Sequence, residues 1–210
     1  MFVMKELAKN SRVCGYLEKI FRALNADKFG GELEVPIITV QSTPKAYGHF
    51  TCGKVWMNAH GDDQYEINIG AGTLNRPVEN VVSTLLHEMV HLYNQMHGIK
   101  DCSRGNTYHN KRFKTKAEEV GLIIEYDSKI GWSVTSPSEE LLDYIIKQGW
   151  EDILINRNDG LRISGGSGDG DKKKSSTRKY QCPCCGMSVR ATKEVHISCM
   201  DCNVQLEVAG

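Results

Sequence analysis

Two histidines and a glutamate near the middle of the chain have the types and spacing that bind and use a zinc ion. They form a His-Glu-x-x-His motif, His87-Glu88-Met89-Val90-His91. Residues four apart lie on one face of a helix, so His87 and His91 can present two imidazoles to one ion, while Glu88 points about a quarter-turn away. Zinc lowers the pKa of bound water toward ~7, and a nearby carboxylate can take the proton as that water attacks a carbonyl. The motif therefore predicts a zinc hydrolase in which Glu88 is the catalytic base.

The surrounding residues predict a buried helix for the motif, ending near Gly98. Pro77 suits a first helical turn, and Glu79 suits the positive end of a helix. Apolar residues cover much of the expected helix surface: Val78, Val81, Val82, Leu85, Leu86, Met89 and Val90. Two histidines and a glutamate in such a helix carry a desolvation cost unless they have partners. The alternative is an ordinary core helix with satisfied histidines, which requires chance to supply all three residues together.

His97 is one candidate for a third metal ligand. It follows His91 with the metzincin spacing, and Asn94 stands where that pattern has glycine. Asparagine tolerates a left-handed backbone, so the match is not trivial. However, metzincins also need a downstream methionine turn, and no methionine occurs between Met96 and Met187. On a continuing helix His97 also faces away from His91, which favours a capping or surface role.

His109 is the candidate that we favour. We expect a second helix to begin near Tyr108, capped by Asn106 or Thr107, so that His109 is held rigidly in the first turn. From there its ring can face the motif helix across the core. The carboxylates of Glu118-Glu119 are a further alternative, as in zinc enzymes with a glutamate ligand. They lie well along this helix, and we expect them to face solvent.

Four cysteines near the C-terminal end have the spacing of a structural zinc site. Two C-x₂-C pairs supply four thiolates and leave no open position on a tetrahedral ion: Cys182, Cys185, Cys199 and Cys202. We expect a zinc ribbon with a hairpin of Val189–Ala191 and Val195–Ile197, followed by a third strand at Val204–Val208. So small a module should fold only with its metal.

Cys184 is the surplus thiol of this region. Pairing Cys182 with Cys185 keeps the two-residue gap and puts Gly186 directly after a ligand, where a tight knuckle needs it. Cys184 then stays free, and exchange with the ligands is left open. Eight cysteines in a chain without an export signal favour metal over disulfides. The remaining three are expected as small, buried apolar residues: Cys14, Cys52 and Cys102.

The chain divides into three predicted parts, and its expected fold class is α+β. Residues 1–156 are expected to form the domain that carries the motif, with a small antiparallel sheet before the motif helix. Residues 157–179 are rich in glycine, serine and lysine and are expected to be a flexible linker. Residues 180–210 are expected to form the zinc ribbon.

Periodicity predicts helices at both ends of the first domain and short strands between them. One helix is expected over residues 2–26, and a final helix opens at Ser136-Pro137-Ser138-Glu139. Inward positions of the final helix are expected at Leu141, Leu142, Ile145 and Ile146. Strands are expected at Ile37–Gln41, His49–Thr51, Lys54–Trp56, Tyr65–Ile69 and Leu122–Tyr126. Turns are expected at Pro44, Gly48, Gly53 and Gly61. Three aromatic residues are expected to serve in packing: Tyr108, Tyr126 and Trp132. A substrate chain can add to a sheet edge, at Tyr65–Ile69 or in the Phe50–Trp56 region.

The charge balance and the apolar content bear on partners and location. Residues 1–156 hold 17 Lys and Arg against 20 Asp and Glu, and residues 157–210 hold 9 against 6. The basic end fits an anionic partner such as nucleic acid, although solvated charge explains it equally well. No stretch approaches the ~18 apolar residues of a membrane span, and the first residues do not read as a signal peptide. We therefore expect no membrane partner and a cytoplasmic location, with association with the nucleoid left open.

Taken in order along the chain, these motifs resemble those of the SprT-like zinc metalloproteases. The resemblance rests on Phe29-Gly30-Gly31-Glu32-Leu33, Tyr47-Gly48-His49-Phe50, the His-Glu-x-x-His motif, Tyr108-His109-Asn110-Lys111-Arg112-Phe113 and the cysteine tail. It implies a zincin-like fold of minimal gluzincin type, with His87, His91 and His109 as zinc ligands and Glu88 as catalytic base. Members of the family include the eukaryotic Spartan proteases, which digest proteins crosslinked to DNA, and bacterial SprT proteins.

We therefore predict a zinc-dependent endopeptidase with one catalytic and one structural zinc ion. Its expected partner is a protein or peptide substrate, and the ribbon and basic linker are expected to recruit DNA or a DNA-bound protein. Two alternatives stay open: a non-proteolytic, zinc-containing nucleic-acid-binding or regulatory protein, and a zinc hydrolase of a non-protein amide. Cleavage specificity and oligomeric state have no signature in the sequence.

Overall fold

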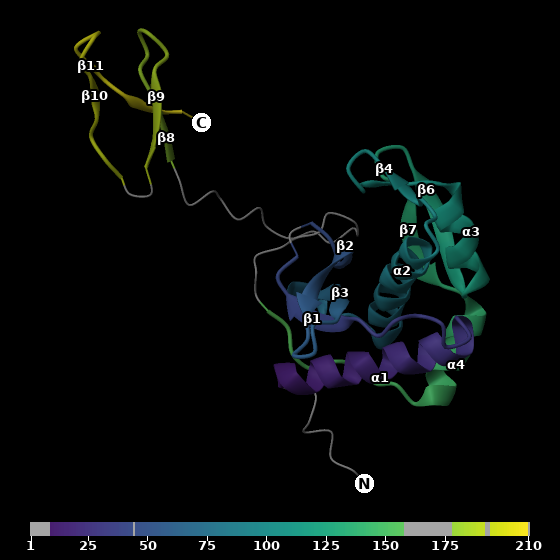
Figure 1. Ribbon diagram of the computed structural model, residues 1–210. Coiled ribbons are helices and arrows are strands. Elements are labelled where there is room, and N and C mark those ends of the chain that lie inside the picture. The colour runs from purple at the N-terminus through teal and green to yellow at the C-terminus, as the bar shows by residue number, and fades with distance from the viewer. Residues whose placement is uncertain (1–8, 44, 158–177, 192–193, 210) are drawn as a thin grey trace. The chain divides into compact units, whose positions relative to one another are not determined.

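Two separate units make up the chain, and each is described by itself. The computed structural model describes residues 9–43, 45–157, 178–191 and 194–209. Its two units are residues 1–164, the N-terminal unit, and residues 165–210, the C-terminal unit (Figure 1). The division falls inside the expected linker of residues 157–179, of which residues 158–177 lie outside the described residues.

The N-terminal unit is a mixed α+β structure in which helices pack on two small sheets. In chain order its elements are α1 (Asn10–Lys28), β1 (Ile37–Gln41), β2 (Gly48–Met57), β3 (Asp63–Gly70), η1 (Ala71–Thr73), α2 (Val78–Met96), β4 (Cys102–Ser103), β5 (Tyr108–His109), α3 (Lys111–Glu119), β6 (Leu122–Asp127), β7 (Gly131–Pro137) and α4 (Glu139–Gln148). The expected α+β class is confirmed.

Helix α1 buries one apolar face, as its periodicity predicts. Its fully buried residues are Val13, Leu17, Ile20, Phe21 and Leu24. The helix begins at Asn10 and continues to Lys28 rather than to residue 26. Residues 2–8 of the expected helix lie outside the described residues.

The first sheet is mixed rather than antiparallel, which corrects the sequence prediction. Its strand order is β1-β3-β2, with β1 parallel and β2 antiparallel to the central β3. β3 takes the centre because Ile67–Gly70 are all buried and because the Asn68 side chain bonds to β1. The Asn68 Oδ1 accepts from the Gln41 amide at 2.8 Å and from the Thr39 hydroxyl at 3.1 Å. β2 therefore lies at an edge of this sheet.

The segments expected as two strands at His49–Thr51 and Lys54–Trp56 form the single strand β2. Gly53, expected as a turn, lies inside it, and the pairing register with β3 shifts between Thr51 and Trp56. Such an irregularity absorbs the extra residues without ending the strand. Gly48 is the first residue of β2, and Gly61 supplies the turn into β3 with a φ of 86°. Pro44 lies outside the described residues.

The second sheet has the order β4-β5-β7-β6, and helix α3 begins later than expected. Asn110, rather than Asn106 or Thr107, is the cap. Its Oδ1 accepts from the Arg112 amide at 2.7 Å and from the Phe113 amide at 3.3 Å. His109 therefore lies in strand β5 and not in a first helical turn. Its place is set by pairing, because β5 bonds to β4 on one side and to β7 on the other.

Helix α2 carries the His-Glu-x-x-His motif and is anchored from far along the chain. It ends at Met96, and Gly98 has a φ of 65°, as the predicted stop requires. At its start the Val78 amide donates to Asp152 Oδ1 at 2.7 Å. In the segment before it, the Leu74 amide donates to Asn156 Oδ1 at 3.0 Å. The residues after α4 therefore satisfy backbone groups at the beginning of the motif helix.

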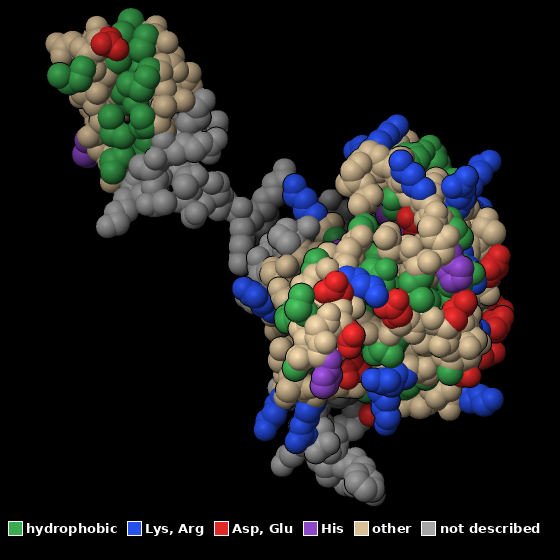
Figure 2. All heavy atoms as spheres, in the orientation of Figure 1, with side chains coloured by type: hydrophobic (Ala, Val, Ile, Leu, Met, Phe, Trp, Pro, Cys, Tyr) green, Lys and Arg blue, Asp and Glu red, His purple; other side chains and the backbone are tan. Residues whose placement is uncertain are grey.

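The core is built around α2. The largest fully buried side chains come from α1, β3, α2 and α3, and from the turn before α2: Phe21, Phe113, Leu17, Ile20, Leu24, Ile67, Ile69, Leu74, Leu85, Leu86, Met89 and Leu92. Charged side chains of both signs are scattered over the visible face of the N-terminal unit (Figure 2). Within the described residues, no helix is long and apolar enough to cross a membrane.

Helix α4 packs on the core through a narrower face than expected. Ser138 caps it, and its side chain accepts from the Leu141 amide, so the helix opens within the predicted segment Ser136-Pro137-Ser138-Glu139. Leu141 and Ile145, one turn apart, are buried, and Leu142 is half-buried. Ile146 is 76% exposed, so its predicted inward orientation is wrong.

The C-terminal unit consists of short strands around the cysteines. They are β8 (Arg178–Gln181), β9 (Ser188–Ala191), β10 (Ser198–Cys199), β11 (Val204–Gln205) and β12 (Glu207–Ala209). β9 pairs with β8 and not with the segment Val195–Ile197, so the predicted hairpin is wrong. The reason is that the first knuckle is itself the turn between β8 and β9, which makes them neighbours. The expected strand Val204–Val208 is divided at Leu206, whose amide donates to Ile197 O at 2.8 Å.

Gly131 tests how strongly β7 holds His109 in place. Its φ is 73°, and a Cβ here would overlap the His109 carbonyl oxygen and lie 3.0 Å from Tyr108 Cε1. We expect Gly131→Ala to lower the free energy of unfolding by about 2–5 kcal/mol, from left-handed strain and crowding together. Urea unfolding followed by far-ultraviolet circular dichroism measures this.

Gly30→Ala is the matched control for this experiment. Gly30 has a similar φ of 62°, but no atom lies within 4 Å of an added Cβ. We expect it to lose only about 1–2 kcal/mol, the cost of the left-handed conformation alone. Equal losses in the two variants would contradict the packing of β5 against β7.

Candidate metal centres

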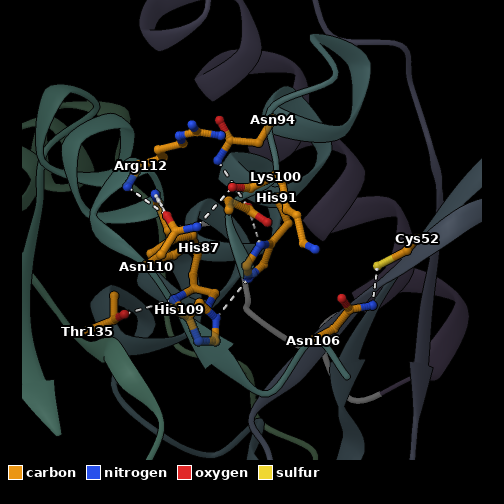
Figure 3. Close-up of polar contacts among 12 residues, drawn as sticks. Cys52, His87, His91, Asn94, Lys100, Asn106, His109, Asn110, Arg112 and Thr135 are labelled. Carbon is orange, nitrogen blue, oxygen red and sulfur yellow. Dashed lines mark hydrogen bonds and ion pairs between the residues drawn. The ribbon is translucent and has the colours of Figure 1, made fainter. Parts of the chain in front are cut away.

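Three histidine rings meet at one point of the N-terminal unit (Figure 3). His87 and His91 come from α2 and His109 from β5. The Nε2 atom of His109 lies 3.2 Å from that of His87 and 3.0 Å from that of His91. Donor atoms of all three residues lie within 4.8 Å of one another. The fold therefore brings together the three histidines that the sequence selected as ligands.

The Nδ1 atom of each ring has a hydrogen-bond partner. The type of partner determines whether Nδ1 carries the proton. Nδ1 of His91 lies 2.7 Å from Asp101 Oδ2, and a carboxylate only accepts. Nδ1 of His87 lies 2.8 Å from the Thr135 hydroxyl, which donates its own proton to the Ser133 carbonyl. Nδ1 of His109 lies 3.4 Å from the Ile130 carbonyl, again an acceptor. Each Nδ1 therefore carries a hydrogen, and each Nε2 presents a lone pair.

Three lone pairs that face one another are satisfied by a cation at their centre. Burial and the neighbouring histidines hold the pKa of His87 well below its usual value. Burial lowers the pKa of His109 to about 4, so neither ring takes up a proton near neutral pH. Tetrahedral ligands at zinc–nitrogen distances of 2.0–2.1 Å stand about 3.3 Å apart, close to the spacing of these Nε2 atoms. The donor set therefore fits a zinc ion.

Asp101 fixes the orientation of His91, and sequence reasoning missed it. Its Oδ2 also accepts from Asn94 Nδ2 at 3.0 Å. Burial raises the pKa of Asp101, but the hydrogen bonds from His91 and Asn94 outweigh it and hold this pKa below its usual value. The carboxylate is therefore ionised and makes the His91 ring a better donor. Its only sequence signal is its place in the polar run Lys100-Asp101-Cys102-Ser103-Arg104-Gly105.

Phe113 and Thr135 complete the surroundings of the three rings and were also missed as site residues. The Phe113 ring centre lies 4.5 Å, 4.6 Å and 4.7 Å from those of His87, His91 and His109. It forms an apolar wall that excludes water from one side of the cluster. Phe113 ends the run Tyr108-His109-Asn110-Lys111-Arg112-Phe113 on which the family resemblance partly rests, whereas Thr135 lies in no motif.

Glu88 is buried beside the cluster, on the side of strand β2. Burial raises the pKa of its carboxyl group to about 7. The Phe50 backbone donates a hydrogen bond to it, and this contact lowers the pKa. A Cβ at Gly48 would lie 3.3 Å from Glu88 Oε1 and 2.9 Å from the Asn68 carbonyl oxygen. The missing side chain at Gly48 therefore leaves the space in which Glu88 sits against the edge strand.

The loop between β4 and β5 reaches β2 at the site. Asn106 Nδ2 lies 3.2 Å from Cys52 Sγ (Figure 3). Arg104 and Asn106 have φ values of 52° and 66°, which form the tight turn of this loop. Cys52 is exposed, so its predicted burial is wrong, whereas Cys102 is buried and Cys14 is half-buried.

The other proposed third ligands lie outside the cluster. His97 caps α2, with Nδ1 at 2.8 Å from the Tyr93 carbonyl oxygen and its ring stacked on Tyr93. Its Nε2 lies 3.5 Å from Glu32. Glu118 and Glu119 lie near lysines of their own helix and face solvent. His97 therefore has the expected capping role, and Glu118 and Glu119 have the expected positions on the surface.

A second group of possible ligands shares two residues with this network. His91, Asp101 and Cys102 also have donor atoms within 4.8 Å of one another. However, His91 and Asp101 are already bonded to each other, and burial raises the pKa of the Cys102 thiol. A protonated thiol is a poor ligand. We therefore interpret this group as hydrogen-bonded surroundings that hold the His91 ring in place, and not as a second metal site.

The cysteines of the C-terminal unit form the second candidate centre. Cys182, Cys185, Cys199 and Cys202 have sulfur atoms within 4.8 Å of one another. The sulfurs of Cys185 and Cys199 lie 3.7 Å apart, and tetrahedral zinc with 2.3 Å bonds separates its sulfur ligands by about 3.8 Å. The Cys185 backbone amide, with smaller contributions from neighbouring groups, lowers the pKa of Cys182 to about 7, which favours the thiolate.

The choice among the clustered cysteines follows the predicted knuckle. Cys184 is exposed and is not a member of the four-sulfur group. Gly186, directly after Cys185, has a φ of 76° that only glycine adopts readily. His196 lies outside the group, with Nδ1 at 3.1 Å from Gln205 Nε2.

His109 and His97 can be distinguished by metal content. We expect the wild-type chain to hold two zinc ions and His109→Ala to hold one, because two imidazoles bind the ion too weakly to survive dialysis. His97→Ala removes the histidine ring of the other candidate ligand, and we expect this variant to keep two zinc ions. Atomic absorption on dialysed protein measures this. If His109→Ala kept two zinc ions and His97→Ala held one, His109 would be excluded as a ligand.

Asp101→Asn tests the support of His91. We expect zinc affinity at the histidine site to fall by about 10–100-fold, because the amide is a weaker partner for Nδ1–H. Competition with a chromophoric chelator measures the affinity. Asp143→Asn, an exposed change in α4, is the control and should leave it unchanged. Equal affinity in both variants would show that Asp101 is not coupled to the metal.

Comparison with known proteins bears on most of the N-terminal unit. The model of the SprT-like family matches residues 17–130, which is more than half of the 210 residues. The matched range includes α2, β5 and all three clustered histidines. No curated protein matches the chain, and no solved structure does. The matched family is of metalloprotease type. The chain belongs to the SprT-like family.

Proposed function

We propose that the chain is a zinc-dependent endopeptidase, with a zincin-like N-terminal unit and a zinc ribbon at the C-terminal end. The observation that carries this proposal is the convergence of three Nε2 lone pairs beside a buried glutamate. His87, His91 and His109 would hold the catalytic zinc ion, and Glu88 would be the base. The metalloprotease type of the family supports the same assignment.

The metal and the glutamate divide the chemistry between them. A zinc ion bound by three imidazoles supplies Lewis acidity, which makes water a stronger acid and polarises a carbonyl group. Glu88 takes a proton from the attacking water as its oxygen bonds to the peptide carbonyl carbon. When the carbon–nitrogen bond breaks, Glu88 delivers that proton to the leaving amine. A carboxyl group whose pKa is raised to about 7 can hold and release a proton near neutral pH.

The remaining residues keep the ligands and the substrate in position. Asp101 and Thr135 hold the Nδ1 hydrogens of His91 and His87, so both rings keep their lone pairs inward. Of the two strands expected to receive substrate, β3 is interior and β2 lies at the sheet edge. An extended substrate chain would therefore add to β2, next to Glu88.

The four cysteines would hold a structural zinc ion, because four thiolates leave no position for water or substrate. The ribbon, together with the basic linker, would recruit the enzyme to DNA or to a DNA-bound protein. Proteins crosslinked to DNA are the substrate class that this recruitment favours. The rival function is a nucleic-acid-binding or regulatory protein without peptidase activity.

Glu88→Gln separates metal binding from catalysis. The amide has nearly the shape of the carboxylate but cannot take a proton, so we expect two bound zinc ions and a loss of cleavage of about 10²–10⁴-fold. Cleavage of an unfolded protein and of a protein crosslinked to DNA, with and without added DNA, is followed by gel electrophoresis.

Glu79→Gln is the matched control on the same helix, away from the cluster, and should cleave as the wild type does. Full activity of Glu88→Gln would exclude Glu88 as the base. Binding of DNA by the zinc-loaded wild type without cleavage of any protein would favour the rival function. Cleavage of small amides alone would instead favour a hydrolase of non-protein substrates.

A further inference from the structure

A shallow groove on the N-terminal unit lies apart from the histidine cluster. It has a volume of about 440 Å³, and its lining residues are Tyr108, Asn110, Lys111, Tyr126 and Trp132. Tyr108 directly precedes His109 in β5, so the two side chains leave opposite faces of the strand. Nothing in the proposed peptidase chemistry uses this groove, which we call the aromatic groove.

The rings of the aromatic groove are arranged as an open platform. Tyr126 is 53% exposed, and its ring centre lies 5.1 Å from that of Trp132. Its hydroxyl lies 3.1 Å from the hydroxyl of Tyr108, which joins the third ring to the pair. Trp132 packs partly against the core, as expected, but the predicted packing role is wrong for Tyr126. An exposed ring held by its neighbours offers a flat apolar face to a ligand.

Basic side chains border these rings. The Arg104 guanidinium lies 4.5 Å from the centre of the Tyr108 ring, and the Lys114 ammonium lies 4.1 Å from the centre of the Trp132 ring. Lys111 lines the groove itself. Figure 2 shows Lys and Arg side chains around a hydrophobic patch at the end of the N-terminal unit that carries β4 and β6 in Figure 1. The groove thus combines stacking surfaces with positive charge.

The carboxylates near the groove are engaged in local structure. Asp127 Oδ1 accepts from the Lys129 and Ile130 amides in the β6–β7 turn. Glu118 lies 3.5 Å from the Lys114 ammonium, on the side of α3. Asn110 is occupied as the cap of α3. Lys114 is thus shared with Glu118, whereas Arg104 and Lys111 have no ion pair among the described residues. These two cations favour an anion that also carries flat rings.

We propose that the aromatic groove binds a single strand of nucleic acid, with a base stacked on Tyr126 and Trp132 and phosphates near Arg104 and Lys111. Bases of a single strand expose their faces, whereas bases of a duplex are stacked on one another and paired. An apolar peptide side chain would not use these two cations. This site is independent of zinc and of Glu88, so it can be tested whether or not the chain is a peptidase.

Affinity measurements test the groove in the full-length, zinc-loaded protein. We expect a fluorescent oligothymidylate of about fifteen nucleotides to bind more tightly than a duplex of the same length. Tyr126→Ala and Trp132→Ala should each raise its Kd by about five-fold or more, the effect of losing one stacking contact. Tyr126→Ala removes an exposed ring, so this result does not depend on the core. Fluorescence anisotropy at a fixed, moderate salt concentration gives the Kd values.

Two matched controls remove exposed apolar side chains elsewhere on the same unit. Trp56→Ala in β2 and Ile123→Ala in β6 should bind the oligothymidylate within about two-fold of the wild type. Unchanged Kd values for both groove variants would overturn the proposal. So would a loss in Trp56→Ala as large as that in Trp132→Ala.

Fluorine NMR locates the contact directly, because the chain has three tryptophans. In protein labelled with fluorotryptophan, the oligothymidylate should shift the Trp132 signal, assigned with Trp132→Phe, and leave that of Trp150 in place. Inorganic polyphosphate, which has charge but no bases, should not reproduce the shift. An unmoved Trp132 signal, or an equal shift with polyphosphate, would show that bases do not stack in the groove.

Discussion

The repulsion among three imidazole lone pairs is the constraint that the N-terminal unit has to manage. Two rings stand on α2 and one on β5, and hydrogen bonds to Asp101, Thr135 and Ile130 leave every Nε2 facing inward. A cation converts this repulsion into attraction, so metal binding stabilises the folded state by mass action. Before a metal binds, the large core around α2 holds the three rings together. In the C-terminal unit the balance is different, because the core is small and three of the four clustered cysteines, Cys182, Cys199 and Cys202, belong to it.

Local sequence signals predicted the features that depend on a few neighbouring residues. The extent of α2, its stop at Gly98, the start of α4 at Ser136-Pro137-Ser138-Glu139 and the exclusion of Cys184 from the cysteine group all agree with the structure. The errors arose where distant residues decide. β3 lies between β1 and β2 partly because Asn68 bonds to β1, and β9 pairs with β8 because a knuckle joins them. Neither choice has a signature in the periodicity of the strands.

His109 lies in the histidine cluster, but not for the structural reason that we expected. We expected it in the first turn of a helix, but Asn110 is the cap, and β5 is held by pairing with β4 and with Gly131. The histidine reaches the cluster because two strands position it, one of them from later in the chain. Asp101, Thr135 and Phe113 contact the rings through the same tertiary arrangement. Predicting them would have required the pairing of β5 with β7, which no motif reveals.

The contacts of Asp152 and Asn156 with the beginning of α2 have a consequence for biosynthesis. These acceptors lie 74 and 82 residues after the amides that they satisfy. While the ribosome is still adding α3 and α4, the beginning of the helix that bears two of the histidines therefore lacks both of these acceptors. A nascent chain completes the unit only after this last segment has emerged, which delays assembly of the metal pocket until nearly all of its supporting residues are available.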